Sequence, residues 1–424
     1  MMRACVFALL CAVLFSADCA EYFVSPAGKG RAGTKAEPAK DIGNLGELQP
    51  GDVINMAEGV YLGKAEAGRD EILVPVKIVG GWDSTFSKRE PWSAHKTILS
   101  GDNTSKNFDG GARIEINLMK YRGAPADVLI DGIIVDNAGR NRYTGEGAKI
   151  VRKANPKSGE MPTPESAGIL VKASKGVNAT VQNCVVINCA PTTGALSVWG
   201  GQGSSCVVRN NLVVNNTGSG IETNTLWRPR DGRDLPTFTV EGNTVLFTWK
   251  HDAFGNIGGN GFQMDPDTVV TASGNVFAFS DTAGVNNIKK TKGLTLKDNL
   301  LVGNLQCDYL EFNTKLDAGK IEDDDSILSR ESKGNVSVKI DLNMDKDWAE
   351  RYAARNVIDR NAAEADVKAA NTRLNAWRGI LGLPLQAADL KVDSDIWLHK
   401  IKLDEALRLG AKKFEGKYGC QPAQ

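Results

Sequence analysis

The chain has 424 residues, of which 51 are acidic and 51 basic, so its formal net charge is zero. This balance lacks the excess of positive charge that nucleic-acid-binding domains carry. A chain of this length can bury an ample hydrophobic core, and after residue 20 it has no apolar stretch long enough to span a membrane. Neither a nucleic-acid-binding protein nor a transmembrane protein is therefore expected.

The N-terminus predicts a secretory signal peptide over residues 1–20. Arg3 precedes an apolar run that extends to Phe15, and the residues of the cleavage region end at Ala20. We therefore expect a secreted or periplasmic protein whose mature chain begins near residue 21. Five cysteines remain after that point, an odd number that leaves at least one outside any disulfide bond, and their spacing matches no metal site. They are Cys184, Cys189, Cys206, Cys307 and Cys420.

Short strands are predicted in the first part of the mature chain. Pro50 and Gly51 predict a turn before the first of them. The predicted strands are residues 53–56, 76–79, 97–99 and 128–134. Residues 137–166 are polar, basic and contain proline, which predicts a long insertion between strands.

A repeat of short strands organises the chain from Thr180 to Asn313. Five segments align, each with a strand-like start, a small or polar pair and then an apolar run, and they begin at Val181, Val208, Val240, Ala272 and Leu296. The second member of each pair is, in turn, Cys184, Asn211, Asn243, Asn275 and Asn299. Successive intervals of 27, 32, 32 and 24 residues indicate a repeat architecture, and strands this short predict a parallel β-solenoid.

An asparagine at the same bend of successive coils has a structural explanation. Its side-chain amide can hydrogen-bond to the asparagine above and the one below, which satisfies buried polar groups along the turn. We therefore predict an asparagine ladder through these positions, with Cys184 as a small buried substitute at one of them.

Together with several N-terminal motifs, the repeat resembles the secreted right-handed parallel β-helix proteins of the pectin-lyase-like superfamily. The N-terminal motifs are Tyr22–Pro26, Leu48–Asp52, Gly59–Tyr61 and Gly80–Asp83. The resemblance covers roughly residues 21–340 and implies a single-stranded β-helix with three parallel sheets per coil. It implies no single activity, because this superfamily hosts many reactions.

Residues 341–424 predict a small C-terminal helical region. Asp347 and Glu350 are a candidate capping box at the start of a segment with helix-like apolar spacing, and a second helix is expected from Leu403 to Phe414. The predicted organisation is thus a signal peptide, a β-helix over residues 21–340 and a helical appendage.

Any ligand site is expected on the outer face of the first sheet of the β-helix. Strand side chains alternate between core and solvent, so with Ile169, Ile221 and Phe262 pointing inward, two outward rows follow. The first row is Leu170, Ser197, Glu222, Gln263, Asn286 and Glu311. The second row is Lys172, Trp199, Asn224, Asp265, Ile288 and Asn313. Rows of polar groups with an indole, spaced ~4.8 Å apart, suit a polysaccharide lying on the coils.

Two charged loops are expected to form the walls of a groove on this face. The first follows the strand of Glu222, and the second precedes the next strand of the same sheet. The loop residues of interest are Arg228, Arg230, Lys250 and His251.

The groove suits a polysaccharide lyase that cleaves a uronic-acid-containing polymer by β-elimination. This reaction needs a cation beside the uronate carboxylate and a base that removes the α-proton. Arg230 or Arg228 is a candidate for the first role, and Lys250 or His251 is a candidate for the second.

Glu222 and Asp265 are open to two further interpretations. They are candidate ligands of a calcium ion, because neighbouring carboxylates otherwise repel one another. Alternatively, they are the acid and base of an inverting glycoside hydrolase, since side chains one strand apart and two residues along lie about 8 Å from each other. Polygalacturonase-like members of the superfamily, however, carry paired aspartates together with a Gly-His-Gly motif, and no such motif occurs in this chain.

A non-catalytic role is the third possibility: a polysaccharide-binding or structural solenoid, expected to be a monomer. A strand face that meets solvent is polar in any case, so the two rows do not by themselves require a ligand. The predicted substrate-binding residues are Lys172, Trp199, Asn224, Arg228, Gln263, Asn286 and Glu311. Trp199, Trp227 and Trp249 could each stack on a sugar or anchor a loop.

Overall fold

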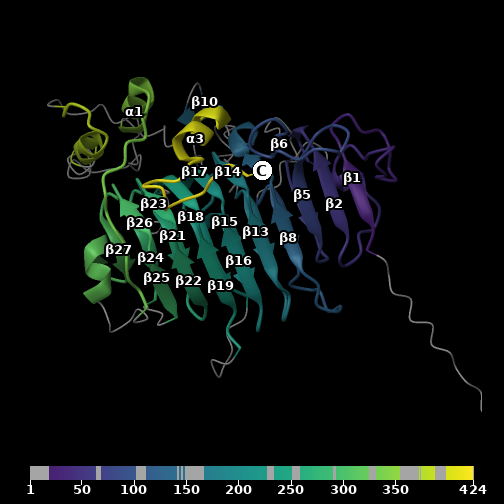
Figure 1. The fold of residues 1–424 in the computed structure, drawn as a ribbon, viewed down its shortest axis with the longest axis horizontal. Coiled ribbons are helices and arrows are strands. Elements are labelled where there is room, and N and C mark those ends of the chain that lie inside the picture. Colours follow the sequence, from purple (N-terminus) through teal and green to yellow (C-terminus); the bar gives the residue numbers. More distant parts are fainter. Residues whose placement is uncertain are drawn as a thin grey trace, which may run out of the picture.

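Three large β-sheets form the body of the protein, and their strands stack side by side along its long axis (Figure 1). The computed structural model describes residues 19–63, 68–101, 111–140, 143–144, 147–148, 167–226, 234–250, 258–289, 293–323, 331–353, 372, 374–386 and 398–423. Within these residues the neighbouring strands of the three sheets are parallel, except for the last pair of one sheet.

The strands of each sheet follow one another in chain order. Sheet A contains β1 (Glu21–Val24), β2 (Val53–Ala57), β5 (Lys77–Trp82), β8 (Val128–Asp131), β13 (Ala179–Gln182), β16 (Ser205–Arg209), β19 (Thr237–Glu241), β22 (Val269–Ser273) and β25 (Leu294–Lys297). Sheet B contains β3 (Gly59–Tyr61), β6 (Thr97–Leu99), β9 (Ile134–Asp136), β14 (Val185–Ile187), β17 (Leu212–Thr217), β20 (Thr244–Trp249), β23 (Val276–Ala278) and β26 (Leu300–Val302). Sheet C contains β4 (Asp70–Ile72), β7 (Ile114–Asn117), β12 (Ile169–Lys172), β15 (Gly194–Gly200), β18 (Ser219–Thr225), β21 (Asn260–Met264), β24 (Ala283–Asn287), β27 (Cys307–Glu311) and β28 (Thr314–Leu316).

From β13 to β27 the chain passes through sheets A, B and C in that order, again and again. The five segment starts that the sequence aligns are register partners on sheet A, from Val181 to Leu296. Their strands alternate buried and accessible residues, and the buried ones meet residues of sheet C such as Ile221 and Phe262 in one apolar core. Long parallel sheets visited in this order fit the predicted β-solenoid.

Buried asparagines connect successive coils at the turn between sheets A and B. The side-chain amide of each asparagine donates to the side-chain oxygen of the asparagine in the next coil at 2.9 Å, and only the last of the series has no such successor among the described residues. The asparagines are Asn211, Asn243, Asn275, Asn299 and Asn335. Cys184 precedes them, and its backbone N–H donates to the side chain of Asn211 at 3.0 Å. These bonds satisfy polar groups that the turn buries.

The N-terminal strands differ in part from the prediction. Residues 128–134 are not one strand but two, β8 and β9, which belong to different sheets. Gly132 between them has a φ of 71°, a conformation that favours glycine and turns the chain from one sheet to the next. Strands β4 and β7 of sheet C were not predicted. The predicted signal peptide and most of the insertion at 137–166 lie outside the described residues.

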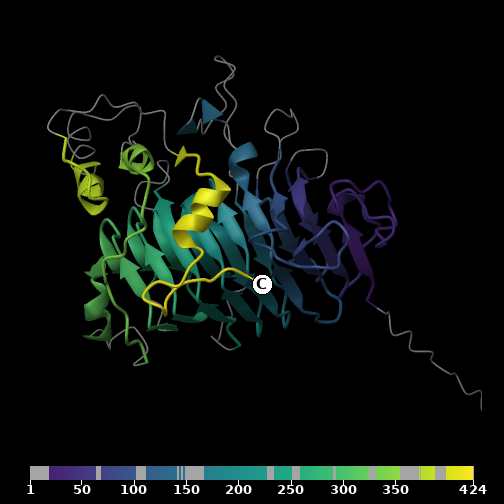
Figure 2. The same ribbon diagram turned by 45° about the horizontal axis from the view of Figure 1, so that its top comes forward.

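The C-terminal part of the chain lies on the outer face of sheet B, where α3 crosses the strands (Figure 2). Its elements are β29 (Leu398–His399) and the helices α1 (Lys346–Ala353) and α3 (Leu403–Gly410). β29 joins β10 (Tyr143–Thr144) and β11 (Gly147–Ala148) in a small antiparallel sheet. Short 3-10 helices are η1 (Ile42–Asn44), η3 (Asn137–Gly139) and η5 (Ala318–Asp323). Within the described residues, no helix is both long and apolar enough to cross a membrane.

Aromatic side chains fill the contact between α1 and sheet B. Tyr352 lies 4.5 Å from Phe247 and 4.6 Å from Trp249, measured between ring centroids. Trp249 is 1% exposed, so it is a packed anchor in this contact rather than a platform for a sugar. The hydroxyl of Tyr352 and the indole nitrogen of Trp249 both donate to Asn215 at 2.9 Å, which satisfies the polar atoms of both rings.

Asparagine side chains in the two turns that flank the strands of sheet B hold the last part of the chain. In the turn after β14, Asn188 exchanges two hydrogen bonds with the backbone of Ile401, at 2.9 and 3.0 Å. In the turn before β17, Asn210 exchanges two with the backbone of Gln421, at 2.8 and 3.1 Å. Residues 399–421, which we call the strap, therefore run over sheet B from one of these turns to the other.

The predicted capping box at α1 is wrong. The helix begins at Lys346, and the carboxylate of Asp345 accepts a hydrogen bond from the N–H of Asp347 at 2.7 Å. Glu350 instead forms an ion pair with the buried Arg378. Several acidic residues precede the helix, so spacing alone did not identify the one that caps it.

Candidate functional site

The outer face of sheet C carries the predicted rows. Leu170, Ser197, Glu222, Gln263 and Asn286 are register partners on five successive strands, as the alternation of the sequence predicted. In the second row, Lys172, Trp199 and Asn224 are also partners. Asp265 follows β21 directly, and its backbone N–H donates to the carbonyl of Thr223 at 3.0 Å. The coils therefore bring these side chains to one surface.

The predicted position of Glu311 in the first row is wrong. Asn286 pairs with Leu310, and Tyr309 pairs with the core residue Val285. Glu311 points inward, is completely buried and accepts a hydrogen bond from the Tyr309 hydroxyl at 3.1 Å. The sequence left open whether Leu310 or a neighbour points inward on this strand. In the structure Tyr309 and Glu311 point inward, and the glutamate accepts the hydrogen bond of the tyrosine hydroxyl.

The carboxylate of Glu222 is occupied by contacts within the coils. Glu222 is 2% exposed, and its Oε2 accepts hydrogen bonds from the Gly194 N–H at 2.7 Å and the Ser197 hydroxyl at 2.9 Å. Its Oε1 accepts a longer bond from Asn224 at 3.3 Å. A general acid or base must reach a proton on the substrate, and this carboxylate joins neighbouring strands instead.

Gln263 also accepts hydrogen bonds from residues of the coils. It is 7% exposed, and its amide oxygen accepts hydrogen bonds from Ser219 at 3.0 Å and Asn260 at 3.4 Å. The first row is therefore mainly structural at its two central positions. The second row, two residues further along each strand, is more accessible.

Only part of the predicted catalytic set is described. Arg228, Arg230 and His251 lie outside the described residues. Lys250 is half-buried at the end of β20, where its backbone N–H donates to Asp281 at 2.8 Å. The lyase assignment of these four residues stays a prediction.

Glu222 and Asp265 do not gather further metal ligands. Within the described parts of the chain, no three His, Cys, Asp or Glu side chains form a group that could hold a metal ion. Both oxygens of Glu222 also already accept hydrogen bonds, which a calcium ion would have to replace. The calcium site stays a prediction, without support from these contacts.

Trp199 lies between Lys172 and Asn224 in the second row. The Nζ atom of Lys172 lies 5.3 Å from the centroid of its ring, within the range of a cation–π contact. The indole nitrogen is buried and has no hydrogen-bond partner within the described residues. A buried donor of this kind calls for an acceptor that the described chain does not supply.

A hollow of about 780 Å³ lies just past the ends of the strands that carry this row. Ala173, Gly201 and Leu226, which follow Lys172, Trp199 and Asn224 closely in the chain, line it together with Met119 and Tyr121. Met119 is 52% exposed, so the hollow presents apolar surface next to the polar row. Its size is in the range of small-ligand sites.

No family model, curated protein or solved structure matches the chain. The chemistry of the site must therefore be argued from its own residues.

Strands β4 and β7, which were not predicted, extend the charged part of this face. Glu115 of β7 is the register partner of Leu170 and is 3% exposed. Its carboxylate lies 2.7 Å from the Lys172 Nζ and 3.1 Å from the Arg69 Nη2. The signal was the alternation of two isoleucines with Glu115 and Asn117, which is typical of a half-buried strand.

Proposed function

We propose that this protein is a polysaccharide-binding parallel β-solenoid, right-handed and single-stranded, whose buried asparagines form a ladder. The ligand lies across the second row of sheet C. Trp199 carries the proposal, because its half-buried ring stands in register between a lysine and an asparagine and beside a hollow. An aromatic face binds the apolar face of a sugar ring, and the neighbouring polar groups bind its hydroxyls.

The hydrogen bonds that Glu222 accepts within the coils favour a binding role over hydrolysis. A hydrolase needs two carboxylates that act on substrate from opposite sides, and Glu222 is held by Gly194 and Ser197. Elimination would depend on Arg230 or Arg228 as the cation and on Lys250 or His251 as the base, so it needs a readout of its own.

The purified chain is incubated with acidic and neutral polysaccharides, with and without calcium. Retention on the polymer, ultraviolet absorbance and reducing ends are measured in the same samples. Retention without change in the other two readings is expected. A rise in absorbance would replace the proposal with a lyase, and new reducing ends without absorbance would replace it with a hydrolase.

The Trp199→Ala variant tests whether the row is the binding surface. We expect a dissociation constant at least about tenfold higher, since the burial of an aromatic face on the ligand is lost. Trp199→Phe keeps an aromatic ring and should retain most of the affinity. Phe312→Ala is the control, because Phe312 is 65% exposed at the far end of the sheet. Equal binding by the two alanine variants would reject the proposed surface.

A further inference from the structure

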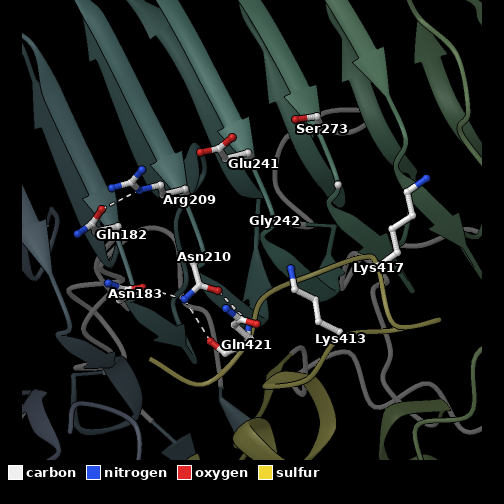
Figure 3. Close-up of a pocket in the computed structure, with 11 residues that line it drawn as sticks. Gln182, Asn183, Arg209, Asn210, Glu241, Gly242, Ser273, Lys413, Lys417 and Gln421 are labelled. Atoms are coloured by element: carbon white, nitrogen blue, oxygen red, sulfur yellow. Dashed lines mark hydrogen bonds between the residues drawn. The ribbon is translucent and has the colours of Figure 1, made fainter. Parts of the chain in front are cut away.

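A second cleft lies at the turn between sheets A and B, beneath the strap (Figure 3). The residues just before the buried asparagines have positive φ values, 50° at Asn210, 59° at Gly242 and 63° at Gly274. Asn210 fills its place with an amide that holds Gln421. At the two glycines no side chain fills the corresponding space. A Cβ on Gly242 would meet only Lys413 and Gly419, each at 3.7 Å, so the cleft there is open.

Positive charge is in excess around this cleft. Arg209 lines it from the end of β16, and Lys413 and Lys417 line it from the strap. Glu241 is the one carboxylate among the lining residues. Lys417 is 2.9 Å from Asp298, which partly neutralises it, whereas Lys413 contacts the carbonyl of Gly419.

Several polar groups of the cleft have no partner within the described chain. Arg209 is an exposed side chain whose Nε donates to Gln182 at 2.8 Å, and its two terminal nitrogens make no hydrogen bond within the described residues. Arg209 and Glu241 are register partners, yet these two described residues form no ion pair with each other. The hydroxyl of Ser273 and the carboxylate of Glu241 also make no hydrogen bond to the described residues.

We propose that this cleft binds a carboxylate-bearing sugar unit. A guanidinium that Gln182 orients through Nε, with both terminal nitrogens available, matches a carboxylate, and Lys413 adds charge. Glu241 and Ser273 accept hydrogen bonds from ring hydroxyls, which a simple anion could not donate. Glu241 repels the acid group of either ligand, so the hydroxyls that donate to Glu241 and Ser273 are what favour a sugar acid over an anion without hydroxyls. The cleft volume of about 560 Å³ is sufficient for one such unit.

This inference goes beyond the function proposed for sheet C, because it uses different residues at a different corner of the coils. The two can fail separately. Trp199→Ala should leave the cleft unchanged, and variants of the cleft should leave the sheet C surface unchanged.

The test is a ligand-observed NMR titration of the full chain with glucuronate, glucose and inorganic sulfate at constant ionic strength. We expect glucuronate to bind at least about tenfold more tightly than glucose or sulfate, because only glucuronate supplies both an acid group and hydroxyls. Arg209→Ala should weaken glucuronate binding by a similar factor. Lys413→Ala should do so too, whereas its neighbour Lys412, which does not line the cleft, provides a control with the same charge change.

Gly242→Asn provides a second test that does not remove a charge. Asparagine tolerates the positive φ and would fill the cleft as Asn210 does one coil earlier. We expect a folded protein that no longer binds glucuronate. The inference is overturned if glucose or sulfate binds as tightly as glucuronate. It is also overturned if Arg209→Ala matches Lys412→Ala, or if a folded Gly242→Asn variant keeps full affinity.

Discussion

Sheets B and C are built from the same coils, but the outer face of sheet B is covered, whereas that of sheet C is partly accessible. On sheet B four outward residues of β14 and β17 are aliphatic and completely buried beneath the C-terminal part of the chain: Val185, Ile187, Leu212 and Val214. On sheet C the outward residues of β12, β15 and β18 are mostly polar, and the second row is only half-buried. The first face closes the protein on itself, whereas the second presents chemical groups.

The sequences of the strands account for this difference. β14 reads Val-Val-Ile, so residues on both of its faces are apolar, and a strand of this kind needs cover on both sides. β12 reads Ile-Leu-Val-Lys and has a burial pattern that alternates, so one face of it can remain accessible. A solenoid can thus cover one sheet and leave another accessible by changing every second residue.

Removal of the C-terminal part should have the largest effect on this contrast. A chain that ends at Ile340 would expose outward residues of sheet B such as Leu212, Leu246 and Trp249. Each loses roughly 1.5–3 kcal/mol of burial, and a whole domain is stable by only about 5–15 kcal/mol. We expect aggregation or a fall in melting temperature of more than roughly 10 °C. Thermal unfolding monitored by circular dichroism measures this.

A chain that lacks only residues 422–424 is the control, because it keeps the whole strap and loses from this contact only the partly buried Ala423. It should melt like the full chain. If the chain ending at Ile340 also melted within a few degrees of the full chain, the cover on sheet B would be dispensable, and the comparison of the two faces would lose its physical basis.

Glu222→Gln should have an intermediate effect, on stability rather than on binding. The Oε2 atom accepts from both Gly194 and Ser197. A glutamine can keep these two bonds only as a neutral acceptor, and its amide nitrogen then faces the Asn224 donor. We expect a loss of about 1–3 kcal/mol in the free energy of unfolding. Glu47→Gln, at an exposed position, should cost less than about 0.5 kcal/mol. Polysaccharide affinity should stay within about twofold. A stable variant that loses function would instead make Glu222 a functional group.

Much of the fold could be predicted from sequence, because local rules determine it. The asparagine positions and the alternation within each strand identified the coils, and the register of five strands on sheet C followed. Glu311 was misplaced because Tyr309 and Leu310 are both plausible core residues. Which of these two residues is buried depends on a hydrogen bond between Glu311 and Tyr309, and no pattern of hydrophobicity records that bond.

The contacts over long sequence distances could not be predicted. Trp249 was open to either a sugar or a packing role, and only the position of Tyr352, far along the chain, decides between them. The apolar triplet of β14 did indicate a covered face, but it did not say what covers it. The cleft beneath the strap likewise combines Arg209 with Lys413, which lie far apart in the sequence.

The smallest expected effect concerns how firmly the strap closes sheet B. Cys420 in the strap is completely buried, and burial raises the pKa of its thiol to about 12, so it stays protonated at pH 8. A thiol reagent should therefore modify it only when the strap opens locally. Asn210→Gly keeps the positive φ but removes the amide that holds Gln421. We expect modification of Cys420 to become about tenfold faster, measured by mass spectrometry of the labelled peptides.

Asn183→Gly is the matched control, because Asn183 has a similar φ of 54° and bonds to Asp131 and Asn210 instead of the strap. It should leave the rate at Cys420 nearly unchanged. Cys184, inside the coils, should remain slow in both variants, since its exposure requires the coils themselves to open. If Cys184 accelerates together with Cys420, the strap and the coils open as one unit. The cover on sheet B would then be part of the solenoid core rather than a separately held layer.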